Sequence, residues 1–293
     1  MTLTTAESRI QIAFMGGLGN QLFQYSFGRY LTKHFNLKVL YSDFGLSVKG
    51  NTERRYMLGD LVAVRPKKAF TRLQIVLIRL FSYLFSSLII FESGPLDSPE
   101  TRIRKSSKLL FGYFQNYRFA DSVKAELLNG FKKSELFADI VPSIARHEIA
   151  VHMRYGDYAK NTTTKQTHGL TATSYYVHAV QLLLKSEQNY KKIVIYSDEP
   201  EHALAEFTKA YGKSDIPVVA SEFSSEYDDL REMAGSSGIV ISNSSFSWWA
   251  AWIGSNCIGS TVIAPFPWLA NPSAYDEKLI PSNWVVIERE LQS

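Results

Sequence analysis

Arg154 is the residue with the most evident chemical use, because it follows directly after an apolar run over residues 149–153. An arginine at the end of a strand presents a planar fork of donors that suits a diphosphate group. His152 beside it could hydrogen-bond a base or a ribose, and Asp157 could orient Arg154 or act as a base. Taken alone, an ion pair between Arg154 and Asp157 explains this segment better. His152 and Asp157 lack further convergent ligands, so no metal site is predicted.

Two hydroxyl residues, Ser244 and Ser245, follow a second apolar run over residues 239–242. They would stand at the start of a helix, either as capping residues or as phosphate donors. The tryptophans in that helix have the spacing of core residues. The hydroxyl groups between a strand and the start of a helix are therefore a better indication of a functional site than the tryptophans are.

A glycine-rich segment with Gly17, Gly19 and Asn20 follows a third apolar run, over residues 10–15. Glycines after a strand let the backbone approach a ligand, and the helix that follows offers free N–H groups. The segment is not a dinucleotide fingerprint, because Leu22 occupies the place of the third glycine, and no P-loop lysine follows. Taken alone, it predicts a tight structural turn.

Two acidic residues stand in similar places. Asp198 follows an apolar run over residues 192–196 and precedes a helical pattern, so it could receive donors from a ribose or a base. It could equally cap that helix. Asp229 lies in a further helical pattern upstream of Ser244.

The elements that must position these residues alternate between strands and helices, except over residues 53–116, which show no clear pattern. Such alternation predicts an α/β fold of parallel βαβ units, in two Rossmann-like domains (residues 1–145 and 146–293) that face each other across a cleft. Ligands bind at the carboxyl ends of parallel strands, where each group above falls. Strands are predicted over residues 10–15, 37–41, 149–153, 192–196, 218–219, 239–242 and 261–264, and helices over residues 20–35, 121–137, 172–188, 199–211, 228–234 and 247–253.

The composition is that of a globular protein of enzyme size. Its 293 residues are 45% hydrophobic, and a formal charge of +4 is too weak a bias to indicate a partner. No recognised nucleic-acid-binding motif is present, so that function is discounted. Cys257 is the only cysteine, which excludes an intramolecular disulfide and a thiolate zinc site.

One apolar stretch, over residues 75–91, has two interpretations. Arg79 lies within it, and an arginine in mid-span makes a membrane-spanning helix unfavourable. A buried core helix is the simpler expectation. The alternative is a helix that lies on an anionic membrane, with peripheral contact through residues 65–91.

Four segments, read together, resemble the α-1,2-fucosyltransferases of bacterial type (glycosyltransferase family 11). They are residues 16–25 (GGLGNQLFQY), 152–158 (HMRYGDY), 196–199 (YSDE) and 243–252 (NSSFSWWAAW), in the family's order. The resemblance implies a GT-B-like fold and an inverting reaction that uses GDP-fucose as donor, without a metal or a cofactor. It implies a galactose-containing glycan as acceptor, and we expect a bacterial cytoplasmic enzyme, with the inner membrane as the surface for any peripheral contact.

The resemblance also implies roles for individual residues. Arg154 would bind the β-phosphate, His152 and Asp229 would lie near guanine, and the glycine segment would close over the pyrophosphate or the sugar from the other domain. The donor-binding residues that it implies are Gly17, Gly19, Asn20, His152, Arg154, Asp198, Asp229, Asn243, Ser244, Ser245 and Phe246.

The reaction needs charge stabilisation and proton removal. Negative charge grows on the leaving β-phosphate, so Arg154 and the amides near Ser244 and Ser245 would stabilise the transition state. The acceptor hydroxyl must lose a proton, and Asp157 is the first choice as general base, with His152 as the second. A reaction without a dedicated base remains an alternative.

Two positions depart from the family pattern. Tyr155 stands where the family usually has a second arginine, and Glu199 stands where it has a second aspartate. One alternative is therefore a transferase for another GDP-sugar or another linkage. The other is a nucleotide-binding module without turnover, which Tyr155 alone supports.

Overall fold

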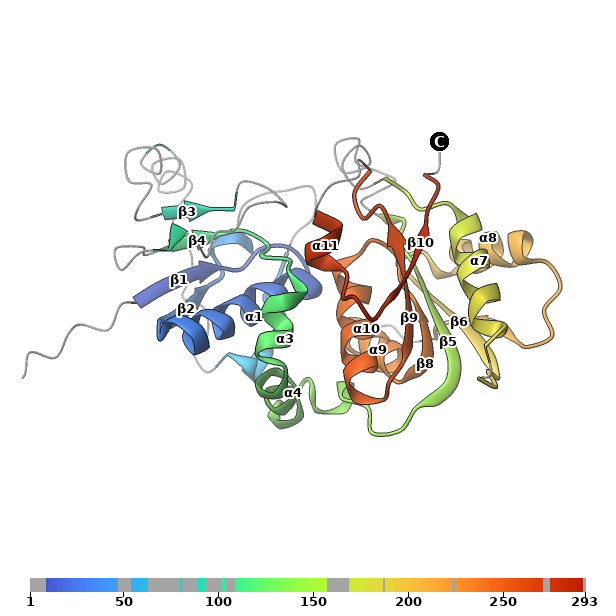
Figure 1. Ribbon diagram of the computed structural model, residues 1–293, viewed down its shortest axis with the longest axis horizontal. Coiled ribbons are helices and arrows are strands. Elements are labelled where there is room, and N and C mark those ends of the chain that lie inside the picture. The colour runs from blue at the N-terminus through green and yellow to red at the C-terminus, as the bar shows by residue number, and fades with distance from the viewer. Residues whose placement is uncertain are drawn as a thin grey trace, which may run out of the picture. The chain divides into compact units, whose positions relative to one another are not determined.

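The computed structural model describes residues 9–46, 54–62, 80, 89–92, 102–103, 109–156, 169–186, 188–222, 225–270 and 275–291. The chain divides into two compact units, Met1–Gly130 and Phe131–Ser293. Each unit contains a parallel sheet with helices, as Figure 1 shows, and this confirms the predicted α/β class. The predicted facing of two domains across a cleft stays a prediction.

The first unit contains a four-stranded sheet in the order β2-β1-β4-β3, with every neighbouring pair parallel. Ile10 and Ile12 of its central strand are buried. The long helix after that strand buries Phe23, Phe27 and Leu31, which share one face at a spacing of four residues. The described elements of this unit are β1 (Arg9–Ala13), α1 (Leu18–Phe35), β2 (Lys38–Ser42), β3 (Ile89–Phe91), β4 (Leu109–Phe111) and α3 (Tyr117–Ser122), with short 3-10 turns at Phe44–Leu46 and Gly59–Leu61. The helix α4 (Lys124–Lys133) begins in this unit and ends in the second.

The second unit contains a six-stranded parallel sheet in the order β10-β9-β8-β5-β6-β7. The chain moves outward from β5 to β7 on one side and then returns to build β8 to β10 on the other. This is the strand order of doubly wound nucleotide-binding sheets, and its topological switch point lies between β5 and β8. The strands are β5 (Arg146–Met153), β6 (Lys192–Ser197), β7 (Val218–Ala220), β8 (Ser236–Val240), β9 (Thr261–Phe266) and β10 (Val285–Glu288).

Helices cover both faces of this second sheet. Figure 1 shows α7 and α8 on one side of it and α9 and α10 on the other. The tryptophans of α10 are buried, which confirms the core packing predicted for them. The helices of this unit are α7 (Thr173–Leu184), α8 (Pro200–Tyr211), α9 (Glu226–Ala234), α10 (Ser245–Cys257) and α11 (Tyr275–Leu279), with a 3-10 turn at Ala138–Ile140.

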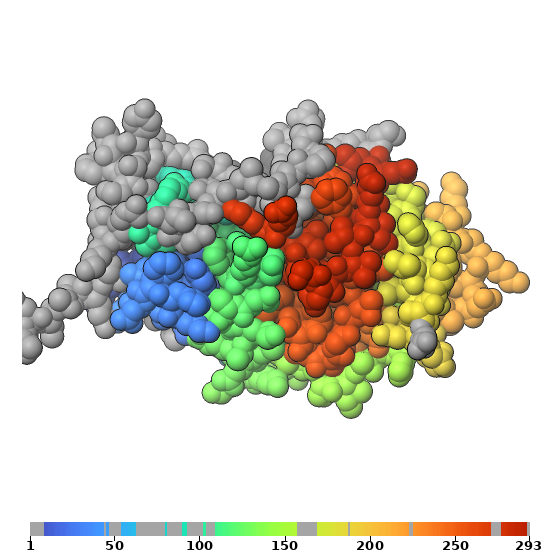
Figure 2. Space-filling view, in the orientation of Figure 1, coloured from blue at the N-terminus to red at the C-terminus, as the bar shows by residue number. Residues whose placement is uncertain are grey.

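The C-terminal end of the chain runs beside the start of α7. Thr171 forms an isolated antiparallel bridge with Leu291, and the Ala172 N–H donates to the Glu290 carbonyl oxygen at 2.9 Å. Figure 2 shows the yellow surface of α7 next to the red surface of the last elements. The segment after β10 therefore pairs with the residues just before α7.

Several element boundaries differ from the sequence-based expectation. The predicted helix over residues 121–137 is two helices, α3 and α4, and the segment without a pattern contains the strands β3 and β4. The compact units divide after Gly130, earlier than the predicted boundary at residue 145. Residues 131–137 belong with the second unit because the Phe131 ring lies 5.6 Å from Phe137 and 6.4 Å from Trp249.

The stretch over residues 65–91 lies almost wholly outside the described residues. Its last three residues, Ile89–Phe91, form β3 and not the end of a helix. In the part of the chain that the structure describes, no helix is both long and apolar enough to cross a membrane. Peripheral membrane contact through this stretch stays a prediction.

Candidate functional site

The switch point of the second sheet brings His152 of β5 to Ser242, which follows β8. The His152 Nδ1 atom and the Ser242 hydroxyl lie 2.8 Å apart, and both side chains are buried. The Phe246 ring of α10 lies 5.6 Å from the imidazole. The structure therefore joins the two predicted groups of residues at the edge of the sheet where nucleotides bind in this strand order.

His152 is a neutral imidazole in this setting. Burial lowers the pKa of His152 from its usual 6.5 to about 3, and the positive charge of Arg154 acts in the same direction. Because Nδ1 is engaged by Ser242, any further hydrogen bond of the ring would use Nε2. A group with so low a pKa is suited to hydrogen bonding and is a weak proton acceptor near neutral pH.

Arg154 forms an ion pair with Asp198, which follows the neighbouring strand β6. Arg154 Nη1 lies 3.1 Å from Asp198 Oδ2, and the Tyr155 N–H donates to Asp198 Oδ1 at 3.1 Å. A Cβ atom on Gly156 would overlap Asp198 Oδ2, so a glycine is needed there for the carboxylate to reach the guanidinium. About a quarter of each side chain in the pair is exposed (27% and 24%), which leaves the guanidinium reachable by a ligand.

The ion pair that the sequence suggested was with Asp157, which lies outside the described residues. The pairing with Asp198 follows from the parallel register, in which Met153 lies opposite Ser197. Arg154 is the first residue after β5, and Asp198 is the first residue after β6, so the two lie next to each other. Asp198 thus holds the arginine, and the Asp198 contact with a ribose or a base stays a prediction.

Tyr155 belongs to the hydrophobic core under α7 and α8. Its side chain is buried, and its ring lies 4.8 Å from the His202 ring of α8. Burial raises the pKa of Tyr155 to about 12, and the nearby Glu206 carboxylate adds to the shift. The residue that replaces the family's second arginine therefore fills a core position.

The polar residues after β8 have local structural roles. The Ser244 hydroxyl caps α10 by accepting from the Phe246 N–H at 3.3 Å, and the Asn243 amide donates to the Trp268 carbonyl oxygen at 3.1 Å. Ser245 is the first residue of α10. The helix-capping role predicted for Ser244 is thus confirmed, whereas contact of these residues with a phosphate stays a prediction.

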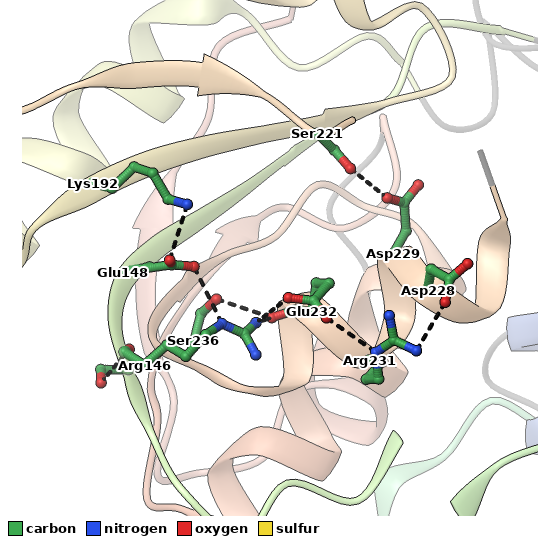
Figure 3. Close-up of polar contacts among 10 residues, drawn as sticks. Arg146, Glu148, Lys192, Ser221, Asp228, Asp229, Arg231, Glu232 and Ser236 are labelled. Atoms are coloured by element: carbon green, nitrogen blue, oxygen red, sulfur yellow. Dashed lines mark hydrogen bonds and ion pairs between the residues drawn. The ribbon is translucent and has the colours of Figure 1, made fainter. Parts of the chain in front are cut away.

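Asp229 lies on α9, near the end of β7. The Ser221 hydroxyl donates to Asp229 Oδ1 at 2.7 Å, and burial raises the pKa of Asp229. Figure 3 shows this carboxylate turned to Ser221, away from the ion-pair network next to it. A half-buried carboxylate with one hydroxyl partner keeps acceptor capacity for a ligand such as a base.

The ion-pair network in Figure 3 anchors α9 to the beginnings of β5 and β6. The nitrogen–oxygen distances between its charged side chains range from 2.9 Å for Arg231–Asp228 to 3.3 Å for Arg146–Glu148. Lys192 pairs with Glu148, and Arg146 and Arg231 both pair with Glu232. This network lies at the amino ends of the strands, so its role is structural.

The glycine segment of the first unit forms a tight turn between β1 and α1. Gly16 has φ of 73°, and a Cβ on it would overlap the Asn20 amide. Gly17 is the N-cap of α1, and Gly19 is buried in the first turn. Asn20 Oδ1 accepts from Gln115 Nε2 at 2.7 Å. The tight structural turn is confirmed.

Sequence reasoning missed two buried glutamines in α1. Gln24 Oε1 accepts from the Met15 N–H at 3.0 Å, and its Nε2 donates to the Gly112 carbonyl oxygen at 2.8 Å, so it joins the ends of β1 and β4. Gln21 is equally buried. The sequence could have indicated them, because both are polar residues on the face of the helix that otherwise buries phenylalanine and leucine.

Among the residues that the structure describes, no three His, Cys, Asp or Glu side chains are grouped as metal ligands would be. The half-buried Cys257 is a free thiol. A reaction without a metal stays a prediction that needs a measurement.

Known proteins similar to this chain were found by sequence and by structure. An α-1,2-colitosyltransferase of Escherichia coli is 28% identical, over 94% of this chain and 97% of that protein. The O-antigen biosynthesis glycosyltransferase WbnK of Escherichia coli is 25% identical, over 92% of this chain and 97% of that protein. The crystal structure of the fucosyltransferase NodZ from Bradyrhizobium is 12% identical, with a TM-score of 0.49, over 85% of this chain and 94% of that chain.

The family assignment rests on a direct match. The family model described as glycosyl transferase family 11 matches residues 105–288, which include the β5 and β8 edge with His152, Arg154 and Ser244. This match covers well over half of the chain, and it confirms the resemblance found in the sequence. The chain belongs to glycosyl transferase family 11.

Proposed function

We propose that the protein transfers L-fucose from GDP-fucose to the 2-hydroxyl of a terminal galactoside, with inversion at the anomeric carbon, to form an α-1,2 linkage on a surface glycan. The observation that carries this proposal is the Arg154–Asp198 pair beside the His152–Ser242 contact, at the switch point of a sheet with the strand order of doubly wound folds. The name of the colitosyltransferase relative supports the α-1,2 linkage. The match to family 11 supports glycosyl transfer as the reaction.

Arg154 has the chemistry to stabilise the leaving group. As the glycosidic bond to the donor breaks, negative charge grows on the β-phosphate of GDP, and a guanidinium held in place by Asp198 needs no reorganisation to meet it. The removal of one such preorganised donor reduces turnover by about 10²–10³. We propose that this charge replaces a metal ion in the reaction.

The proton of the acceptor hydroxyl needs another group. His152, with a pKa of about 3, is a weak base, so we assign it to hydrogen bonding of the donor and keep Asp157 as the proposed base. The half-buried Asp229 carboxylate is the proposed acceptor for guanine N–H groups.

A second donor is supported by the relative named as an α-1,2-colitosyltransferase. Colitose is L-fucose without its 3-hydroxyl, so the two donors differ by a single polar group. A site built to bind that hydroxyl rejects the deoxy sugar by a large factor, about 10⁴ or more, whereas a site that only fits its shape discriminates weakly. Competition between GDP-fucose and GDP-colitose therefore separates the two donors.

The test is a transfer assay with GDP-fucose and lactose in excess EDTA, in which GDP release and product mass are followed. We expect fucosylated lactose from the wild-type protein, and a loss of about 10²–10³ in turnover for Arg154→Ala. Arg118→Ala is the control, because Arg118 is an exposed arginine of α3 outside the site. Product formation that requires an added metal would contradict the metal-free mechanism, and equal turnover in both variants would contradict the role of Arg154.

A further inference from the structure

Gln21 holds the segment that begins at Arg54 against the carboxyl edge of the first sheet. Gln21 Nε2 donates to the carbonyl oxygens of Arg55 at 2.8 Å and Gly16 at 3.0 Å, and its Oε1 accepts from the Met57 N–H at 2.9 Å. The Gln21 side chain is fully buried, so these bonds form in a low-dielectric interior. One side chain thus ties the glycine turn to the segment over residues 54–58.

Apolar contacts fix the same segment. Met57 and Leu58 are buried, and the Tyr56 ring lies 5.7 Å from the ring of Phe14, which follows β1. The segment therefore packs against the core of the first unit.

Arg54 is placed beside the glycine turn by this arrangement. A Cβ on Gly17 would lie 3.6 Å from Arg54 Nη1, so the guanidinium lies next to the backbone of the turn. Arg54 is partly buried, whereas the neighbouring Arg55 is exposed. Gly17 follows β1, and β4 is the parallel neighbour of β1, so the glycine turn lies at the carboxyl ends of two parallel strands, where ligands of such sheets bind.

We propose that Arg54 binds a phosphate group of a substrate, and that Gln21 is the residue that positions it. The planar guanidinium suits a phosphate because it offers two parallel donors to two oxygens. The inference rests on the proposed function, since a nucleotide-sugar transferase handles phosphate groups. The phosphate belongs either to the diphosphate of the donor or to a phosphate on the acceptor.

The test compares Arg54→Ala with Arg55→Ala, which removes the same charge one residue away. With GDP-fucose and lactose, we expect Arg54→Ala to raise the donor KM and the Kd for GDP by about tenfold to a hundredfold, the range of a lost charged hydrogen bond. Arg54→Lys should recover part of this affinity, and Arg55→Ala should stay within about twofold of wild type. Thermal unfolding of each variant checks that the fold is retained.

A phosphate-bearing acceptor separates the two sources. If the donor parameters of Arg54→Ala are unchanged but its KM for lactose 1-phosphate rises while that for lactose does not, the phosphate belongs to the acceptor. If Arg54→Ala and Arg55→Ala behave alike toward GDP, GDP-fucose and lactose 1-phosphate, the inference is overturned. Wild-type protein that neither binds GDP nor transfers fucose overturns the proposed function and this inference together.

The positioning role of Gln21 is tested by a double-variant cycle. Gln21→Glu keeps the shape of the side chain but loses the donor to Gly16 and Arg55, so we expect it to raise the same KM as Arg54→Ala. The double variant should be no worse than Arg54→Ala alone, because Gln21 acts through Arg54. Additive effects would show that Gln21 acts independently. If Gln21→Glu does not fold, the comparison of Arg54 with Arg55 still decides the central claim.

Discussion

At the scale of single residues, the proposed site depends on Arg154, whose guanidinium pairs with the Asp198 carboxylate just after the neighbouring strand. The sequence identified Arg154 and Asp198 separately, but it suggested Asp157 as the ionic partner. The parallel register of β5 and β6 brings Asp198 to Arg154, while the pair with Asp157, which lies outside the described residues, stays a prediction. Such a pairing depends on which strands are neighbours, and a single sequence does not specify that.

Asp198→Asn tests the positioning of Arg154. The amide keeps an oxygen for the Tyr155 N–H but loses the charge that pairs with the guanidinium, so we expect turnover to fall about tenfold or more. Because the pair is partly exposed, stability should change by no more than about 1 kcal/mol. The control is Asp228→Asn, which removes the partner of Arg231 in the ion-pair network. Equal loss of activity in the two variants would contradict the assignment.

His152 makes the stability of the fold depend on pH. Its pKa is about 3 in the folded protein and 6.5 in a free side chain, so between these values the unfolded chain binds the extra proton. The stability linked to His152 is therefore complete above about pH 7 and is lost as the pH falls, by about 2 kcal/mol at pH 5. Thermal unfolding at pH 7.5 and 5 should show a smaller acid effect for His152→Gln than for wild type. An identical acid effect would mean that His152 is protonated in the folded state.

At the scale of elements, strands and helices of strong pattern were predictable, and short elements were not. β5, β6, α8 and α10 lie where the apolar patterns placed them. β3 and β4 have three residues each, too few for an alternating pattern to show. The buried glutamines of α1 were missed for another reason, because only the tertiary fold shows which backbone groups they satisfy.

Gln24→Leu tests the link between β1 and β4. The change leaves the Met15 N–H and the Gly112 carbonyl oxygen buried without their partner, at a cost of about 1–3 kcal/mol for each group. We expect the free energy of unfolding to fall by at least about 2 kcal/mol, as measured by denaturant titration. Thr32→Ala on the same helix is the control, since its hydroxyl donates to the Gly28 carbonyl oxygen of that helix. A variant as stable as wild type would show that Gln24 does not hold the two strands.

At the scale of the whole molecule, the described residues contain two parallel sheets, and the six-stranded sheet of the second unit has a switch point between β5 and β8. The second unit has the strand order of nucleotide-binding sheets and the clustered polar residues, and the first has the glycine turn with Arg54. The alternation of strands and helices was enough to predict this class of fold, while the boundary depended on aromatic contacts between residues far apart in sequence. The central claim is that the second unit binds the nucleotide of a GDP-sugar donor through Arg154.

The most direct test of that claim is calorimetric titration of GDP into wild-type protein, Arg154→Ala and the control Arg118→Ala. We expect GDP to bind to wild type and to the control, and to bind Arg154→Ala with an affinity about tenfold to a hundredfold lower. Absence of GDP binding to the folded wild-type protein, or equal affinity in all three proteins, would contradict the claim.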